Sequence, residues 1–88
     1  DKVGFATNLD ALTTNGATTA FDLGATINAA FATIMVHRNG LMLKQVASSP
    51  ADVDEFSLSL AGGAGGVSQV TFGAAPASSD SVTVFYIA

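Results

Sequence analysis

Cysteine and tryptophan are absent from the 88 residues, and the chain has one histidine, His37, and three basic side chains. Without cysteine, the chain can form neither a disulfide nor a thiolate metal site. Lys2, Arg38 and Lys44 are the whole basic supply, and the net charge is −4. Nucleic acids and anionic membranes are bound through clustered Lys and Arg. We therefore expect neither as a partner.

Charge of either sign is also scarce. Only 11% of the residues are charged, whereas 49% are hydrophobic; ordinary domains carry about 25% charged residues. This balance predicts a folded domain rather than a disordered chain. It also predicts a weakly solvated surface that neighbouring chains cover in part. No apolar run reaches the length of about 20 residues that a membrane-spanning helix needs.

Catalytic residues are not predicted. A Ser-His or Cys-His relay would have to use His37, and no carboxylate lies close to it in the sequence to orient the imidazole. An enzyme would need a cleft with polar groups converging on His37. The alternative, which we favour, is a surface or interface histidine whose charge makes an interface sensitive to pH.

Cofactor and metal sites are not predicted either. The glycine-rich run "AGGAGG" at 61–66 lacks the Lys and Ser/Thr that follow the glycines of a phosphate loop, so it is interpreted as a turn. Asp52, Asp54 and Glu55 share one loop and offer oxygen ligands that suit calcium, but their spacing differs from that of an EF-hand. Solvated loop acids are the expected outcome.

Short alternating segments separated by turn residues dominate the chain after residue 18, and no long helical period is present. The pattern predicts an all-β fold, a small antiparallel β-sandwich or barrel of about six strands. Asn39-Gly40 predicts a type I′ hairpin that folds residues 33–38 back onto a single strand over 41–46. Pro76 and Asp80 mark a later turn. The inward positions give this core: Phe21, Leu23, Ile34, Val36, Leu41, Leu43, Phe56, Leu58, Leu60, Val70, Phe72, Val82, Val84 and Tyr86.

Residues 1–18 show no sustained period and contain two glycines. We interpret 1–18 as an extended N-terminal arm and 19–88 as the β-sandwich domain. Apolar side chains on the arm and on the outward positions of the strands are predicted to contact neighbouring subunits. These predicted interface residues are Phe5, Leu9, Leu12, Met35, Met42 and Phe85.

The order of turns and core positions resembles a β-sandwich module of tailed-bacteriophage virion structural proteins. The resemblance covers about residues 18–88, with "ASSD" at 77–80 where the pattern commonly has a glycine, and Glu-Phe at 55–56 where Asp-Tyr is commoner. The matching positions are Asn39, Gly40, Leu41, Glu55, Phe56, Thr71, Phe72, Ala75, Pro76, Asp80, Val82, Val84 and Tyr86.

The resemblance implies a virion structural protein and not an enzyme. The small size favours a capsid decoration or cement protein, which binds on the capsid surface between subunits and stabilises the head. Its implied partners are its own copies, as a homotrimer or other homo-oligomer, and the major capsid protein or other virion proteins. The alternative is a structural domain of a tail fibre, head fibre or tail adaptor. A carbohydrate-binding module is a weaker alternative, because such sites use exposed aromatic side chains and the only tyrosine lies in a predicted core strand.

Overall fold

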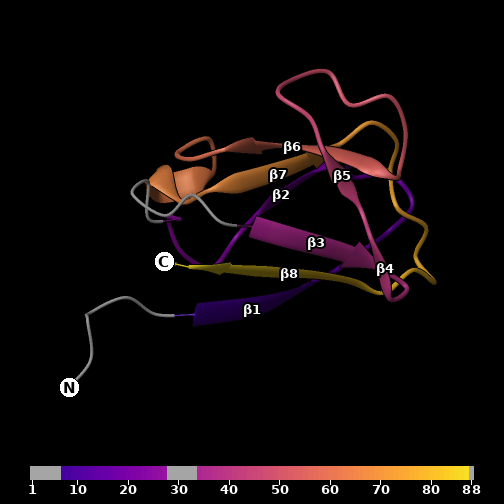
Figure 1. The fold of residues 1–88 in the computed structure, drawn as a ribbon, viewed down its shortest axis with the longest axis horizontal. Helices are drawn as coiled ribbons and strands as arrows, with labels where there is room; N and C mark the ends of the chain where they lie inside the picture. The colour runs from indigo at the N-terminus through magenta and orange to yellow at the C-terminus, as the bar shows by residue number, and fades with distance from the viewer. Residues whose placement is uncertain (1–6, 28–33, 88) are drawn as a thin grey trace.

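The structure, a computed structural model, describes residues 7–27 and 34–87. Two four-stranded sheets lie face to face, which confirms the predicted all-β sandwich (Figure 1). Sheet I has the strand order β1-β8-β3-β4, and sheet II has the order β2-β7-β6-β5. The elements are β1 (Thr7–Leu12), β2 (Ala20–Asp22), β3 (Ile34–Arg38), β4 (Leu41–Met42), β5 (Lys44–Gln45), β6 (Glu55–Ser59), the 3₁₀ turn η1 (Ala64–Gly66), β7 (Gln69–Phe72) and β8 (Val82–Ile87).

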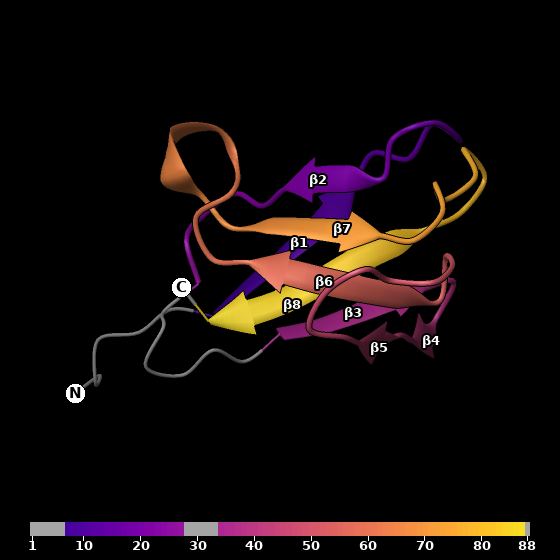
Figure 2. The same ribbon diagram turned by 90° about the horizontal axis from the view of Figure 1, so that it is seen from above.

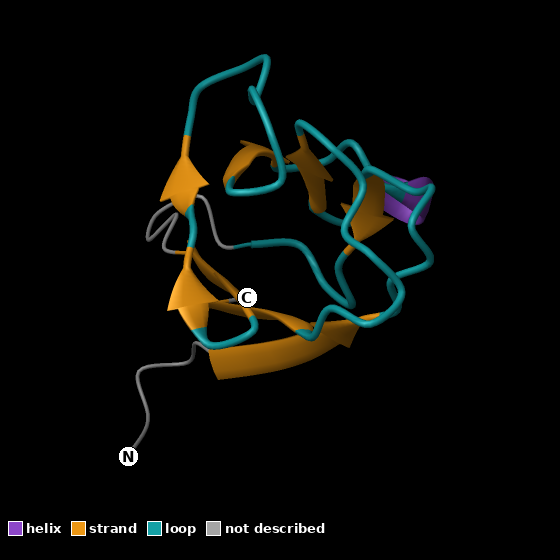
Figure 3. Ribbon diagram, turned by 90° about the vertical axis from the view of Figure 1, so that its right-hand side faces the viewer, coloured by secondary structure: helices purple, strands orange, loops and turns teal. Residues whose placement is uncertain are grey.

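The layers follow from alternation along the longer strands. In β8, Val82, Val84 and Tyr86 are buried and the residues between them are half-buried, so one side of the strand faces the other sheet. Viewed from above, strands of sheet II cross in front of β1 and β8 of sheet I (Figure 2). Viewed from one end, the two sheets are separate layers joined by loops (Figure 3). No helix in the described part of the chain is long and apolar enough to cross a membrane.

The core lies between the sheets, with Tyr86, Val84 and Val36 fully enclosed. Phe21 of β2 meets the edge of the Phe72 ring at a centroid distance of 5.7 Å, a geometry that aromatic pairs prefer. Leu58 is partly buried and packs against this core. The buried apolar side chains are Phe21, Leu23, Ile27, Ile34, Val36, Leu43, Phe56, Val70, Phe72, Val82, Val84 and Tyr86.

The predicted hairpin is confirmed at Asn39 and Gly40, whose φ angles are +54° and +84°. Both central residues of a type I′ turn need a positive φ, which Asn and Gly adopt at little cost. The turn returns β4 alongside β3, with Arg38 opposite Leu41. It also fixes which side chains of the two strands share a face.

The single strand expected over residues 41–46 is wrong, because the chain leaves one sheet for the other at Leu43. β4 pairs with β3 in sheet I, and β5 runs parallel to β6 in sheet II. The Leu43 N–H donates to the Val36 carbonyl at 2.8 Å, and the Lys44 N–H donates to the Asp54 carbonyl at 3.1 Å. Leu43 is therefore buried where the chain crosses the sandwich.

Two residues predicted to be in the core are exposed instead. Leu41 is 65% exposed, because the break at Leu43 leaves the short strand β4 beyond the end of the enclosed layer. Leu60 is 39% exposed, because β6 ends at Ser59 and the strand alternation stops there. Ile27 and Ser68 are buried although the sequence pattern did not indicate it. The Ser68 hydroxyl accepts the Ile27 N–H and donates to the Leu60 carbonyl, each at 2.8 Å.

The predicted boundary at residue 18 also needs correction. Thr7–Leu12 is not an arm but the edge strand β1, which pairs with β8 along its whole length. The segment after it is tied down as well, because the Gly16 N–H donates to the Pro76 carbonyl at 2.9 Å. Alternation did not predict this strand, because one of its inward positions is a carboxylate, Asp10. The rest of the predicted arm, with Phe5, lies outside the described residues.

Candidate functional site

The outer face of sheet I is the most unusual surface of the molecule, and we call it the apolar face. Strand register determines its members, because side chains that are directly opposite on paired strands share a face. Leu9 lies opposite Phe85, and Phe85 lies opposite Met35. The members whose side chains the structure describes are Leu9, Ala11, Met35, His37, Met42, Thr83, Phe85 and Ile87.

This face is continuous across all four strands. One row of neighbours runs from Ala11 through Thr83 and His37 to Met42. Leu9 and Met42, near its two edges, are 69% and 60% exposed. Met35, Phe85 and Ile87, on the strands between these edges, are half-buried. An apolar sheet face that is partly exposed in this way is typical of a surface that another protein covers.

The outer face of sheet II has the opposite character. Alternation in β6 and β7 points small polar side chains outward, for example Ser57 opposite Thr71 and Ser59 opposite Gln69. The outward residues of this sheet are Ala20, Asp22, Lys44, Glu55, Ser57, Ser59, Gln69 and Thr71. A half-buried antiparallel sheet normally has this pattern, with one side in the core and the other solvated. Sheet I departs from it.

The described charges avoid the apolar face. Asp22 lies on the outer face of sheet II, and Asp10 points inward between the sheets. The remaining described carboxylates belong to the 52–55 loop and to the turn that precedes β8. With a neutral imidazole, the described part of the apolar face thus carries no formal charge.

The structure brings four of the predicted interface residues, Leu9, Met35, Met42 and Phe85, together on the apolar face. Leu12 does not belong there, because it lies opposite buried Val82 and packs against the core. Phe5 lies outside the described residues. The predicted interface set lacked Ala11, Thr83 and Ile87, and His37 was expected only as a surface or interface histidine and was not grouped with these residues. For His37, Thr83 and Ile87, alternation with the core residues of β3 and β8 was the available signal.

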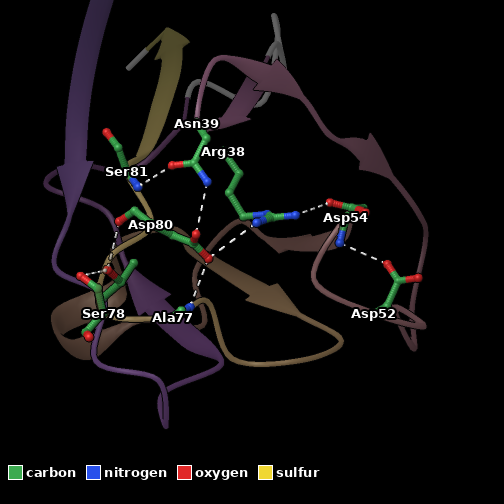
Figure 4. Close-up of polar contacts among 9 residues, drawn as sticks. Arg38, Asn39, Asp52, Asp54, Ala77, Ser78, Asp80 and Ser81 are labelled. Carbon is green, nitrogen blue, oxygen red and sulfur yellow. Dashed lines mark hydrogen bonds and ion pairs between the residues drawn. The ribbon is translucent and has the colours of Figure 1, made fainter.

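A polar cluster closes one end of the sandwich (Figure 4). Arg38 continues the inward side of β3, and its guanidinium pairs with Asp54 at 2.8 Å and with Asp80 at 3.4 Å. Asp54 precedes β6 of sheet II and Asp80 precedes β8 of sheet I, so one side chain bridges the two layers. Arg38 Nε is buried without a hydrogen-bond partner.

Asp80 is held by three groups. The Asn39 amide donates to one of its oxygens at 3.0 Å, and the Ala77 N–H and Arg38 approach the other. The amide contact, followed by the Ala77 N–H and Arg38, places the pKa of Asp80 below its ordinary value. The Ser81 N–H donates to the Asn39 side-chain oxygen at 2.8 Å, which ties the hairpin to the strand beside it.

Two acidic side chains of the 52–55 region, Asp52 and Glu55, also accept hydrogen bonds from nearby backbone N–H groups. The Asp52 carboxylate accepts the Asp54 N–H, and the Glu55 carboxylate accepts the Ala51 N–H, each at 2.9 Å. Within residues 7–27 and 34–87, no three acidic or histidine side chains gather as a metal site would require. No pocket forms among these residues either. The hydrogen bonds of Asp52 and Glu55 fix the ends of the loop, so these carboxylates have a structural role.

A second polar contact secures β1. The Tyr86 hydroxyl donates to the Asp10 carboxylate at 2.7 Å, and the Gly24 N–H donates to the same oxygen at 2.8 Å. Tyr86 is fully buried, so the only tyrosine of the chain serves the core and offers no exposed ring. This contact joins β1 to β8 and to the segment after β2.

Comparisons with protein-family models, with curated proteins and with solved structures found no match to this chain.

Proposed function

We propose that the chain is a structural protein that works by docking other protein chains on the apolar face. The contrast between the two outer faces carries this proposal. The outer positions of sheet II are mostly polar or charged, whereas those of sheet I are mostly Leu, Met, Phe and Ile. A face of that kind loses unfavourable contact with water when another protein covers it.

More specifically, we propose a virion structural protein of a tailed bacteriophage, a capsid decoration protein that binds between capsid subunits. The resemblance of residues 18–88 to such modules supports this, together with physical roles for the matching positions. Asn39 and Asp80 are two of those positions, 41 residues apart, and their side chains are hydrogen-bonded. Val82, Val84 and Tyr86 are three more, and all are buried. The pattern therefore follows turns and core positions on which this fold depends.

The first experiment locates the chain in the particle. Electron cryo-microscopy of virions that contain the chain is expected to show it on the head, at seams between capsid subunits. Density in the tail would instead support the alternative, a domain of a tail fibre or adaptor. Purified virions without the chain would refute both.

A binding assay tests the surface. Capsids that lack the chain are incubated with purified wild type, with Leu9→Lys on the apolar face, or with Ala20→Lys on the polar face of sheet II. Both positions are exposed on edge strands, and both changes add one positive charge. Leu9→Lys is expected to weaken binding at least about ten-fold, and Ala20→Lys to leave it unchanged. Equal effects of the two variants would contradict docking on the apolar face.

A further inference from the structure

We propose that the apolar face binds a second copy of this chain through a twofold axis, so that sheet I of one copy packs on sheet I of the other. This inference rests on the proposed function, which makes the apolar face a contact surface, and it adds the partner and the symmetry. Three observations carry it: the distribution of charge, the shape of the face and the position of His37.

Charge favours a copy of the same chain in this particular orientation. The chain carries a net charge of −4, so two copies repel each other in most orientations. The described carboxylates lie on sheet II, between the sheets or in end loops. Contact through the two apolar faces holds these carboxylates far apart and buries no fixed charge of the described residues. Pairing through the outer faces of sheet II would instead bring Asp22 and Glu55 of the two copies together.

Shape favours twofold symmetry. Two sheets pack well face to face in a nearly aligned arrangement, and a patch that pairs with itself generates a closed dimer. Phe85 lies between Leu9 and Met35 in the middle of the face, and methionine side chains adapt readily to an opposing surface. A threefold assembly would need two different complementary patches, whereas the described sheets offer one apolar outer face.

The area of the face sets the strength of the contact. Sheet I has three strands of five or six residues and the two-residue strand β4, spaced about 4.8 Å apart, so its outer face covers less than roughly 20 Å by 20 Å. A pair of such faces buries clearly less than the roughly 1,600 Å² of a standard interface. The dimer is accordingly weak, with a dissociation constant of roughly 10 μM to 1 mM. Weak pairwise contacts suit a protein that is displayed in many copies on a lattice.

His37 makes the contact sensitive to acid. The groups that face it across the sheet are Thr83 on β8 and Met42 on β4, with Ala11 beyond on β1. None of these can be charged, so the described face has no carboxylate to stabilise an imidazolium. A charged imidazole would be buried in an apolar contact when two copies pair. Protonation therefore weakens the dimer, although protonating carboxylates elsewhere reduces the repulsion between acidic copies.

Sedimentation velocity on the full chain, from about 10 μM to about 1 mM, tests the inference. The decisive pair of variants is Met42→Lys and Leu41→Lys. The residues are neighbours on β4, 60% and 65% exposed, and alternation points only Met42 to the apolar face. Both changes lower the net negative charge equally. Met42→Lys is expected to lower the association constant at least about ten-fold, and Leu41→Lys to change it by less than about two-fold.

A change from about pH 7.5 to about pH 5.5 should weaken the wild-type dimer several-fold, and His37→Gln should remove this weakening. A monomer at about 1 mM, a trimer, or equal effects of the two lysine variants would overturn the inference. The capsid assay separates this inference from the proposed function. If the chain is a monomer and binds capsids, only self-pairing is refuted. If it is a dimer and does not bind capsids, only the virion role is refuted.

Discussion

Replacing Tyr86 by phenylalanine would remove one hydroxyl from the centre of the sandwich and leave its apolar packing in place. Tyr86 is fully buried, and its hydroxyl donates to the Asp10 carboxylate at 2.7 Å. Hydrogen bonds to a charged group contribute about 1.5–3 kcal/mol, and a partner left unsatisfied adds its own penalty. The Gly24 N–H still reaches Asp10 in the variant, which limits that penalty.

We therefore expect Tyr86→Phe to lower the free energy of unfolding by about 2 kcal/mol. The corresponding fall in Tm is roughly 10 °C for a domain of this size. Urea unfolding should be followed by far-ultraviolet circular dichroism, because the substitution removes the only tyrosine and the chain has no tryptophan. The dependence on urea should keep its slope, since the surface exposed on unfolding is unchanged.

Ser57→Ala is the matched control, because it also removes one hydroxyl, here from the outer face of sheet II. Its effect should stay within about 0.5 kcal/mol. Asp10→Asn, alone and combined with Tyr86→Phe, completes a double-mutant cycle whose coupling should exceed about 1 kcal/mol. Additive effects, or a Tyr86→Phe loss no larger than that of Ser57→Ala, would refute the role of this contact in holding β1.

Three further predictions concern the loops. Gly73→Ala should lower the free energy of unfolding measured in urea by about 2–3 kcal/mol, because a Cβ there would collide with the backbone at residues 50–52. Gly65→Ala should lower it by only about 1 kcal/mol, because Gly65 has a φ of +72° but a Cβ there would meet open space. Asn39→Ala should be about 1 kcal/mol less stable than Asn39→Gly, because the φ of +54° suits glycine. Because the pKa of Asp80 is lowered in the folded state, its carboxylate stabilises the fold fully at pH values above the ordinary aspartate pKa. This stabilisation is lost as pH falls through the lower folded pKa. In acid unfolding, Asp80→Asn should therefore make the free energy of unfolding fall less steeply with pH, and an unchanged dependence on pH would contradict this role.

Local patterns were enough to predict much of this fold. Alternation in β6, β7 and β8 identified most of the core, because a strand with one side in the core repeats every two residues. Asn39-Gly40 identified the hairpin, because few residue pairs tolerate two positive φ angles. Both inferences depend only on a residue and its near neighbours in the chain.

Features that depend on distant partners could not be predicted. The crossover at Leu43 exists because β5 finds a partner in β6 rather than in β3. β1 was missed because its inward Asp10 becomes compatible with the interior through hydrogen bonds from Tyr86 and Gly24, which are 76 and 14 residues away in the chain. Likewise, the ion pairs of Arg38 with Asp54 and Asp80 require both sheets to be in place.

The strand pattern predicted only part of the apolar face. β3 and β8 are apolar on both of their sides, whereas β6 and β7 are apolar on one side only. A strand that is apolar on both sides normally lies in a sheet that is covered on both sides. In a single copy, sheet II covers one side of sheet I, and Leu9 and Met42 on the other side are mostly in water. Sheet I therefore has the composition of a sheet that is covered on both sides, which is the physical basis of the proposed assembly role.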